Sequence, residues 1–248
     1  MQSSLVVRMT ENRQAHGWLH KANGAADTLI VLCHGHNSTG DRGRFITLAR
    51  WFEHAGQDCI RWNAVRNRPR ENTFTVLTVT EEYEQVKALL DPMRRKYKRI
   101  IAIGHSQGAL LALKLCAEGI AHTYVSLMGV GDTVESLERK KQALAVQHAP
   151  DKDNQFIILP NGQTFEYTNM FFTDFVSWDV PKLLSLHRGA SLFIAAEQDT
   201  AIPPSEVRNA FKQAHEPKNY LTVDDVHNFS EETSRLIAHA IRDWLQTE

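Results

Sequence analysis

The stretch RIIAIGHSQGALLALKL, residues 99–115, places Ser106 between Gly104 and Gly108 at a change of pattern. The apolar run before the serine predicts a buried strand, and the leucine-rich run after it predicts a helix. A sharp strand-to-helix turn needs residues without bulk two positions before and two after its central residue, and glycine stands at both. The turn also sets the hydroxyl near a helix N-terminus, where free N–H groups favour developing negative charge. The pattern therefore predicts that Ser106 is a nucleophile; a helix-capping serine is the simpler alternative.

Strands and helices alternate along the chain on both sides of this turn. Strands are expected at 28–33, 58–63, 99–104, 123–129, 191–199 and 219–225, and helices at 43–55, 80–96, 106–118, 204–214 and 230–245. Nearly continuous apolar strands separated by helices predict an α/β fold with a mostly parallel sheet and helices on both faces. Residues 4–9 and 15–20 predict an additional hairpin before the first of these strands.

The alternation stops between about 133 and 188. Residues 134–147 are expected to be helical, and 155–168 to form a hairpin that turns at Asn161-Gly162. An insertion between two core strands at the functional end of a sheet is often a lid, so we expect a small lid here. The length of 248 residues fits a single domain, 1–248, with this insertion.

A base and an acid follow Ser106 at the ends of later strands. Asp199 ends the apolar segment SLFIAAEQD, and His227 lies in DDVHNF between the strand at 219–225 and the final helix. Both side chains would project from the carboxyl ends of parallel strands, the edge at which ligands bind in open α/β sheets. Asp132, which follows the strand at 123–129, is the alternative acid. We favour Asp199 because of its loop and because the order Ser, Asp, His is typical of this turn architecture.

The sequence resembles the α/β-hydrolase family over nearly its whole length, from VLCHGH (31–36) through GHSQG (104–108) and EQDTAIPP (197–204) to VHNF (226–229). Within it, the sequence is most similar to small bacterial carboxylesterases of the cinnamoyl or feruloyl esterase type and to serine aminopeptidase-like hydrolases. The features shared with these subgroups are the His-Gly loop, GHSQG and a short insertion that contains a hairpin.

The resemblance implies a role for each of these residues. Ser106 would attack an acyl carbonyl, His227 would transfer the proton, and Asp199 would orient the imidazole. The backbone N–H groups of His36 and Gln107 would form the oxyanion hole, and the reaction would need no cofactor. Metal binding by His34 and His36 is the alternative, but alternate residues of an extended chain diverge and no third ligand lies near them.

Two features bear on the substrate. Phe171, Phe172, Phe175 and Trp178 could form one apolar face at helical spacing, as core packing or as the wall of a substrate pocket. Many relatives have a glycine-rich turn of the RGHG type after the strand at 58–63, whereas this chain has AVRNRPRENTF (64–74). Its arginines, Arg66, Arg68 and Arg70, are either a solvated basic loop or a contact for an anionic part of a substrate.

Composition excludes several classes of protein. The net charge of −1, from 28 Lys and Arg against 29 Asp and Glu, argues against binding to nucleic acid. The three widely spaced cysteines, Cys33, Cys59 and Cys116, indicate free thiols and a reducing compartment. The sequence has no apolar run long enough to span a membrane and no secretion signal, so we expect a cytoplasmic protein.

The predicted function is hydrolysis of a small-molecule carboxylic ester. Amide or peptide cleavage and thioester hydrolysis use the same residues and stay open as alternatives. A binding protein that keeps the fold without turnover is the non-enzymatic alternative, although a binding role would not require Ser106, Asp199, His227 and the His-Gly loop together.

Overall fold

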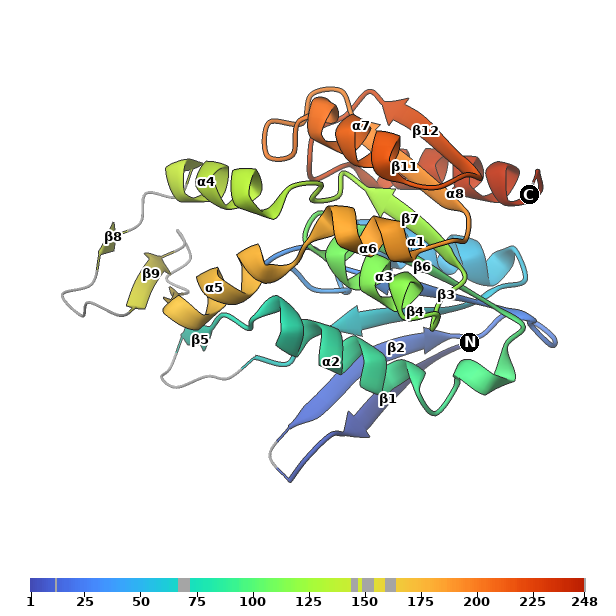
Figure 1. Ribbon diagram of the computed structural model, residues 1–248. Coiled ribbons are helices and arrows are strands. Elements are labelled where there is room, and N and C mark those ends of the chain that lie inside the picture. The colour runs from blue at the N-terminus through green and yellow to red at the C-terminus, as the bar shows by residue number, and fades with distance from the viewer. Residues whose placement is uncertain (12, 67–71, 144–146, 149–153, 159–163, 248) are drawn as a thin grey trace.

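A computed structural model describes residues 1–11, 13–66, 72–143, 147–148, 154–158 and 164–247 (Figure 1). Its main sheet contains β1 (Gln2–Arg8), β2 (Gln14–His20), β3 (Thr28–Cys33), β4 (Asp58–Asn63), β6 (Arg99–His105), β7 (Thr123–Leu127), β11 (Ser191–Ala196) and β12 (Lys218–Val223). The strand order is β1-β2-β4-β3-β6-β7-β11-β12. Neighbouring strands from β4 to β12 are parallel, and β1 and β2 form the predicted antiparallel hairpin at one edge. The predicted mostly parallel sheet is therefore confirmed.

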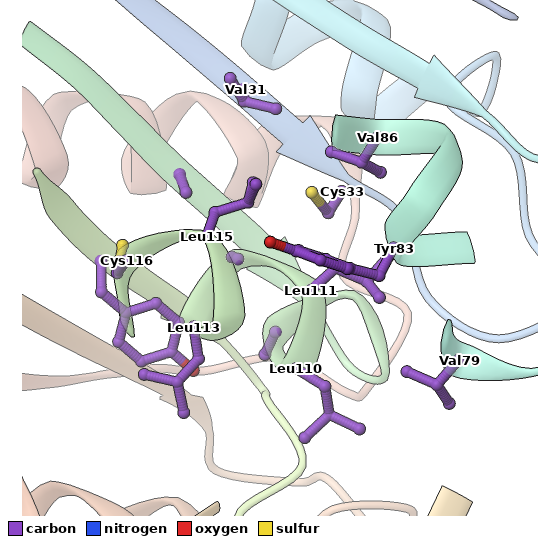
Figure 2. Close-up of a cluster of buried hydrophobic side chains, with 14 of the residues drawn as sticks. Val31, Cys33, Val79, Tyr83, Val86, Leu110, Leu111, Leu113, Leu115 and Cys116 are labelled. Carbon is purple, nitrogen blue, oxygen red and sulfur yellow. The ribbon is translucent and has the colours of Figure 1, made fainter. Parts of the chain in front are cut away.

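Helices cover both faces of this sheet, as predicted (Figure 1). One face carries α1 (Gly43–His54) and α8 (Glu231–Leu245), which bury Phe45, Phe52 and Ile241 in one core cluster. The other face carries α2 (Val79–Leu90), α3 (Gly108–Ala117), α6 (Val180–Leu186) and α7 (Pro204–Gln213). Figure 2 shows the second core cluster, in which Val86 of α2 and Leu111 of α3 pack with β3 side chains. The strands β3, β6, β7 and β11 in the middle of the sheet are buried on both faces, which explains why they are mostly apolar without alternation.

Strand β6, which leads to Ser106, lies in the interior of the sheet. Its residues Ile100 and Ala102 face one core cluster, and Ile101 and Ile103 face the other. The helix that follows is shorter than the predicted 106–118, because Ser106 takes a positive φ and α3 begins only at Gly108.

The expected helix at 80–96 is wrong after residue 90. A capping box begins the helix α2: the Thr78 side chain accepts a hydrogen bond from the Glu81 N–H, and the Glu81 carboxylate accepts one from the Thr78 N–H. The helix ends at Leu90, before Asp91-Pro92, because proline cannot donate the next helical hydrogen bond. A short 3₁₀ turn, η1 (Arg94–Lys96), follows.

Residues 133–188, the predicted insertion, connect β7 to β11. They contain α4 (Thr133–Ala143), β8 (Gln147–His148), β9 (Asn154–Ile158), β10 (Thr164–Thr168), α5 (Asn169–Ser177) and α6. The strands β9 and β10 pair antiparallel, as the predicted hairpin requires, while its turn at Asn161-Gly162 lies outside the described residues. Sequence reasoning missed β5 (Thr73–Thr75), which pairs with β10 and ties the segment after β4 to the insertion.

The three cysteines are buried and free, as expected. Among the helices in the described ranges, none has the length and apolar character that crossing a bilayer requires.

Candidate active site

Ser106 lies at the tight turn between β6 and α3 and has a φ of 55°, a left-handed conformation that is uncommon for serine. The flanking glycines make this turn possible. A Cβ added to Gly104 would lie 2.2 Å from the Gly108 carbonyl oxygen, and one added to Gly108 would lie 2.3 Å from the Cys33 carbonyl oxygen. Both obstacles are backbone atoms, so neither position has room for a side chain. The turn predicted from the two glycines is confirmed.

The structure brings Ser106, His227 and Asp199 together in one hydrogen-bonded chain. His227 Nε2 lies 2.9 Å from Ser106 Oγ, and His227 Nδ1 lies 2.7 Å from Asp199 Oδ2. The Asp199 carboxylate can only accept at Nδ1, so the proton of neutral His227 lies on Nδ1. Nε2 is then the basic nitrogen, and it faces the serine hydroxyl.

Asp199 is held by its own loop. Its second oxygen, Oδ1, accepts hydrogen bonds from the N–H groups of Ala201 and Ile202, at 2.8 and 2.9 Å. The carboxylate is fully buried, so these two donors and the imidazole fix its orientation. Asp132, the alternative acid, lies elsewhere: its Oδ1 accepts from the N–H groups of Val134 and Glu135 and caps the start of α4.

His105 is a site residue that sequence reasoning missed. Its Nε2 lies 2.8 Å from the His227 carbonyl oxygen, to which it donates, so the residue before the nucleophile holds the backbone of the base. Burial, and then the charge of nearby His227, hold the pKa of His105 well below its usual value. His105 therefore stays neutral at physiological pH. In the sequence, only its place beside the serine in GHSQG pointed to a role for His105 in the site.

Arg44 of α1 supports the same loop from the other side. Its Nη2 donates to Asn228 Oδ1 at 2.9 Å, and its guanidinium lies 5.6 Å from the centre of the Phe229 ring. The two residues after His227 are thus fixed to a helix of the core. No feature of the sequence pointed to Arg44.

The His-Gly loop packs directly against the nucleophile. A Cβ added to Gly35 would lie 3.0 Å from the Cβ of Ser106. His34 stacks on Trp62, with ring centres 4.1 Å apart. Its Nδ1 donates to the Gly35 carbonyl and its Nε2 accepts from the Ala64 N–H, so both ring nitrogens are occupied. Burial lowers the pKa of His34 to about 3, which keeps the ring neutral.

The side chains of the two expected oxyanion residues point to structural partners. The His36 ring lies 2.7 Å from the Tyr167 hydroxyl of β10, and Gln107 is fully buried and donates to the Glu82 carboxylate at 2.8 Å. The side chain of each residue is thereby anchored. The Ser106 N–H already donates to the Leu127 carbonyl of β7 at 3.0 Å, so it is not free to bind an oxyanion.

Ser106 and His227 line a pocket of about 260 Å³. Phe175 is the only one of the four predicted aromatic residues among its described lining residues. Phe171 is buried with its ring centre 5.1 Å from that of His36, and Phe172 lies beside Tyr167. Trp178 packs edge-to-face on Tyr83 and lines a separate hollow beside α2. The insertion thus contributes one predicted aromatic to this pocket and the others to packing around it.

The arginine-rich segment after β4 is only partly described. Arg66 donates to the Ser38 carbonyl at 3.1 Å, and burial lowers its pKa. It therefore belongs to the structure around the His-Gly loop rather than to a solvated loop. Arg68 and Arg70 lie outside the described residues.

No protein-family model and no curated protein matches this sequence. Solved structures do match it at the level of fold. Est1E from Butyrivibrio proteoclasticus has a TM-score of 0.77 at 14% identity and covers 98% of both chains. The esterase domain of a Rhodothermus marinus protein has a TM-score of 0.75 at 14% identity, covering 98% of this chain and 97% of that one. The alpha/beta hydrolase GrgF from Penicillium sp. sh18 has a TM-score of 0.73 at 16% identity, covering 97% and 96%. This chain therefore has the α/β-hydrolase fold.

Proposed function

We propose that this protein is a serine hydrolase that cleaves small carboxylic esters through an acyl-enzyme intermediate. One observation carries the proposal: Ser106 Oγ, both ring nitrogens of His227 and the Asp199 carboxylate form one continuous hydrogen-bonded chain on the wall of a pocket. The likeness to solved esterases supports it. A serine placed for helix capping alone would need neither the base nor the buried acid.

The chemistry follows from the protonation of His227. Nε2 removes the proton from Ser106 Oγ as the oxygen attacks the acyl carbonyl, and Asp199 stabilises the imidazolium that forms. The imidazolium then gives the proton to the leaving alcohol, and the acyl group stays on Ser106. A water molecule, activated by the same nitrogen, hydrolyses the acyl-enzyme and regenerates the serine.

The tetrahedral intermediate needs donors for its oxyanion. We assign this role to the backbone N–H groups of His36 and Gln107, which flank Ser106 from the His-Gly loop and from the start of α3. The contacts of their side chains with Tyr167 and Glu82 support the assignment, because they hold both backbones in fixed positions. The Ser106 N–H is not available for this purpose.

The pocket favours a small substrate. Its volume of about 260 Å³ lies below the usual range for drug-sized ligands, roughly 300–1,000 Å³. Val130, Phe175 and Ile202 make part of its wall apolar, and we propose that Phe175 contacts the acyl or alcohol group. In this proposal the segment 133–188, which carries Phe175, is the lid over the site.

Hydrolysis by purified wild type and by Ser106→Ala tests the proposal. The screen contains nitrophenyl esters of graded acyl length, an acyl thioester, aminoacyl anilides and a ferulate ester, since ferulic acid is bound in a structure of Est1E. We expect turnover of short acyl esters by the wild type and none by Ser106→Ala.

The other outcomes separate the alternatives. Faster turnover of the thioester or the anilides at matched concentration would move the protein to thioester or amide hydrolysis. Turnover of nothing in the screen, together with no labelling by a fluorophosphonate probe, would contradict the enzyme proposal and favour the binding protein.

A further inference from the structure

Arg139 of α4 contributes the one permanently charged side chain among the described residues that line the Ser106 pocket. Ser136 lies beside it, and the described lining residues include no carboxylate. Most of the other lining side chains are apolar or small and polar. A cation in the wall of a small, mostly apolar pocket is a selective feature, because it attracts an anionic group more strongly there than in bulk water.

The guanidinium of Arg139 is held in place on two of its three nitrogens. Nε donates to the Ala201 carbonyl at 3.2 Å, in the same loop that carries the Asp199 carboxylate. Nη2 donates to Ser136 Oγ at 3.1 Å and to the Glu206 carboxylate. Because these contacts fix the side chain, binding an anion would cost little additional conformational entropy.

The third nitrogen, Nη1, retains donor capacity. Its contact in the described part of the chain is with Glu135, at 3.5 Å, and the Glu135 side chain is 68% exposed. An ion pair of this length at an exposed carboxylate is weak. A ligand carboxylate in the pocket can therefore replace Glu135 as the partner of Nη1.

Glu206 does not remove this capacity, because other donors share its negative charge. Its Oε1 accepts from the N–H groups of Gly131 and Asp132 and from Ser136 Oγ, at 2.8, 3.0 and 2.9 Å. These three donors would stabilise the buried carboxylate in any case. Arg139 supplies a fourth hydrogen bond through Nη2 and leaves Nη1 unused by Glu206.

We propose that Arg139 is a specificity-determining residue that binds a carboxylate or similar anionic group of the substrate while the scissile carbonyl lies at Ser106. The inference rests on the proposed esterase function and names its substrate class: small esters that carry a negative charge on either the acyl or the alcohol side. It concerns a different segment from Arg66, Arg68 and Arg70, for which a contact with an anionic part of a substrate was one of two alternatives.

Two pairs of esters test the proposal and separate the acyl side from the alcohol side. The first pair is the nitrophenyl monoester of glutaric acid and its methyl-capped neutral analogue. The second pair is 4-carboxyphenyl butanoate and its methyl-capped analogue. The readout is kcat/KM for the anionic ester divided by kcat/KM for the neutral one, compared between variants, so that differences in intrinsic reactivity cancel.

The variants are Arg139→Met combined with Glu206→Gln, which leaves no unpaired buried charge, and Arg208→Met as the matched control. Arg208 lies on α7 with its guanidinium 4.2 Å from the centre of the Tyr220 ring, outside the pocket lining. Its replacement removes a guanidinium and one positive charge outside the pocket, so a general effect of losing an arginine would appear there. The double variant itself leaves the net charge unchanged. Circular dichroism and thermal melting show whether each variant is folded.

We expect the ratio for at least one pair to fall about tenfold in the double variant, the value of a charge-assisted hydrogen bond at a partly exposed site. The neutral esters should be turned over at nearly the wild-type rate, and Arg208→Met should keep the wild-type ratio. The pair whose ratio falls identifies the side of the substrate that carries the charge.

An equal loss of activity toward charged and neutral esters would overturn the proposal and leave Arg139 as a structural contact between α4 and α7. A ratio that is unchanged in both pairs would overturn it as well. In either case the neutral esters are still hydrolysed by the wild type, so the proposed function stands. Turnover of no ester by the wild type would contradict both.

A measurement on the wild type alone covers the case in which the double variant does not fold. Glutarate should slow the labelling of Ser106 by a neutral fluorophosphonate, and the uncharged 1,5-pentanediol, which contains no hydrolysable bond, should not do so at the same concentration. Equal protection by both compounds, or by neither, would contradict recognition of the anion.

Discussion

Replacing Asp199 by asparagine should reverse the protonation of His227. In the structure, Asp199 Oδ1 accepts from two backbone N–H groups, while Oδ2 accepts from His227 Nδ1. An asparagine must place its carbonyl oxygen toward the two N–H donors, which turns its NH₂ group toward Nδ1. Nδ1 then has to accept, so the proton of neutral His227 moves to Nε2. A protonated Nε2 cannot remove the proton of Ser106.

The expected loss is large because the variant keeps the shape of the site and changes only the tautomer. In serine proteases the same substitution lowers kcat about 10⁴-fold, which corresponds to about 5.5 kcal/mol in the activation free energy. We expect a loss of that order at pH 7, measured as kcat for a short-chain nitrophenyl ester. The thermal melting temperature should change little, because the two backbone contacts persist.

Asp132→Asn is the matched control. Asp132 accepts hydrogen bonds from the N–H groups of Val134 and Glu135, and an asparagine oxygen can accept both. This variant should keep wild-type activity. If Asp199→Asn retained more than a tenth of the activity, or if Asp132→Asn lost most of it, the assignment of Asp199 as the acid partner would be refuted.

Three further predictions concern the surroundings of the site. The pKa of His34 is about 3 in the folded protein and near 6.5 in the unfolded chain, so the unfolded state binds more protons between these values and stability falls as the pH drops below about 6.5. Lowering the pH from 7 to 5 should cost about 2 kcal/mol of unfolding free energy through His34 alone, measured by urea denaturation at each pH; equal stability at both would count against a neutral buried ring. Gly108→Ala should destabilise the protein by about 3 kcal/mol, because the new Cβ would meet the Cys33 carbonyl at 2.3 Å, and a soluble variant of wild-type stability would contradict this packing. Tyr167→Phe removes the hydroxyl that accepts from Asn37 Nδ2 at 2.7 Å, which should lower the free energy of unfolding by about 1 kcal/mol. We also expect kcat to fall, because the His-Gly loop loses this contact with β10. An unchanged kcat would show that the loop holds its position without β10.

The core of the fold could be predicted because it follows from local pattern. Strand β3 was expected at 28–33 and β4 at 58–63, and both have those bounds. Every residue of β4 and nearly every residue of β3 is buried, and β3 (TLIVLC) shows this as an almost continuous apolar run, which loops and surface helices do not have. The turn at Ser106 was equally readable, because the close approach of Gly104 and Gly108 to backbone atoms admits no other residue.

The contacts that depend on distant segments could not be predicted. The pairing of β5 with β10 joins residues about ninety positions apart, and three residues of β5 carry too little pattern to be recognised. The same holds for His105, whose partner is a backbone carbonyl that has no signature in sequence. The direction of each side chain on α5 was also hidden: helical spacing placed Phe171 and Phe175 on one face but did not indicate which of them reaches the pocket.

Covalent labelling of the wild type with a fluorophosphonate probe, followed by mass spectrometry of the intact protein and of its peptides, tests most directly whether Ser106 is an activated nucleophile. We expect one adduct, located on Ser106, that is lost in Ser106→Ala and forms much more slowly in Asp199→Asn. An unlabelled wild type, or an adduct that persists in Ser106→Ala, would contradict the claim that Ser106 is an activated nucleophile.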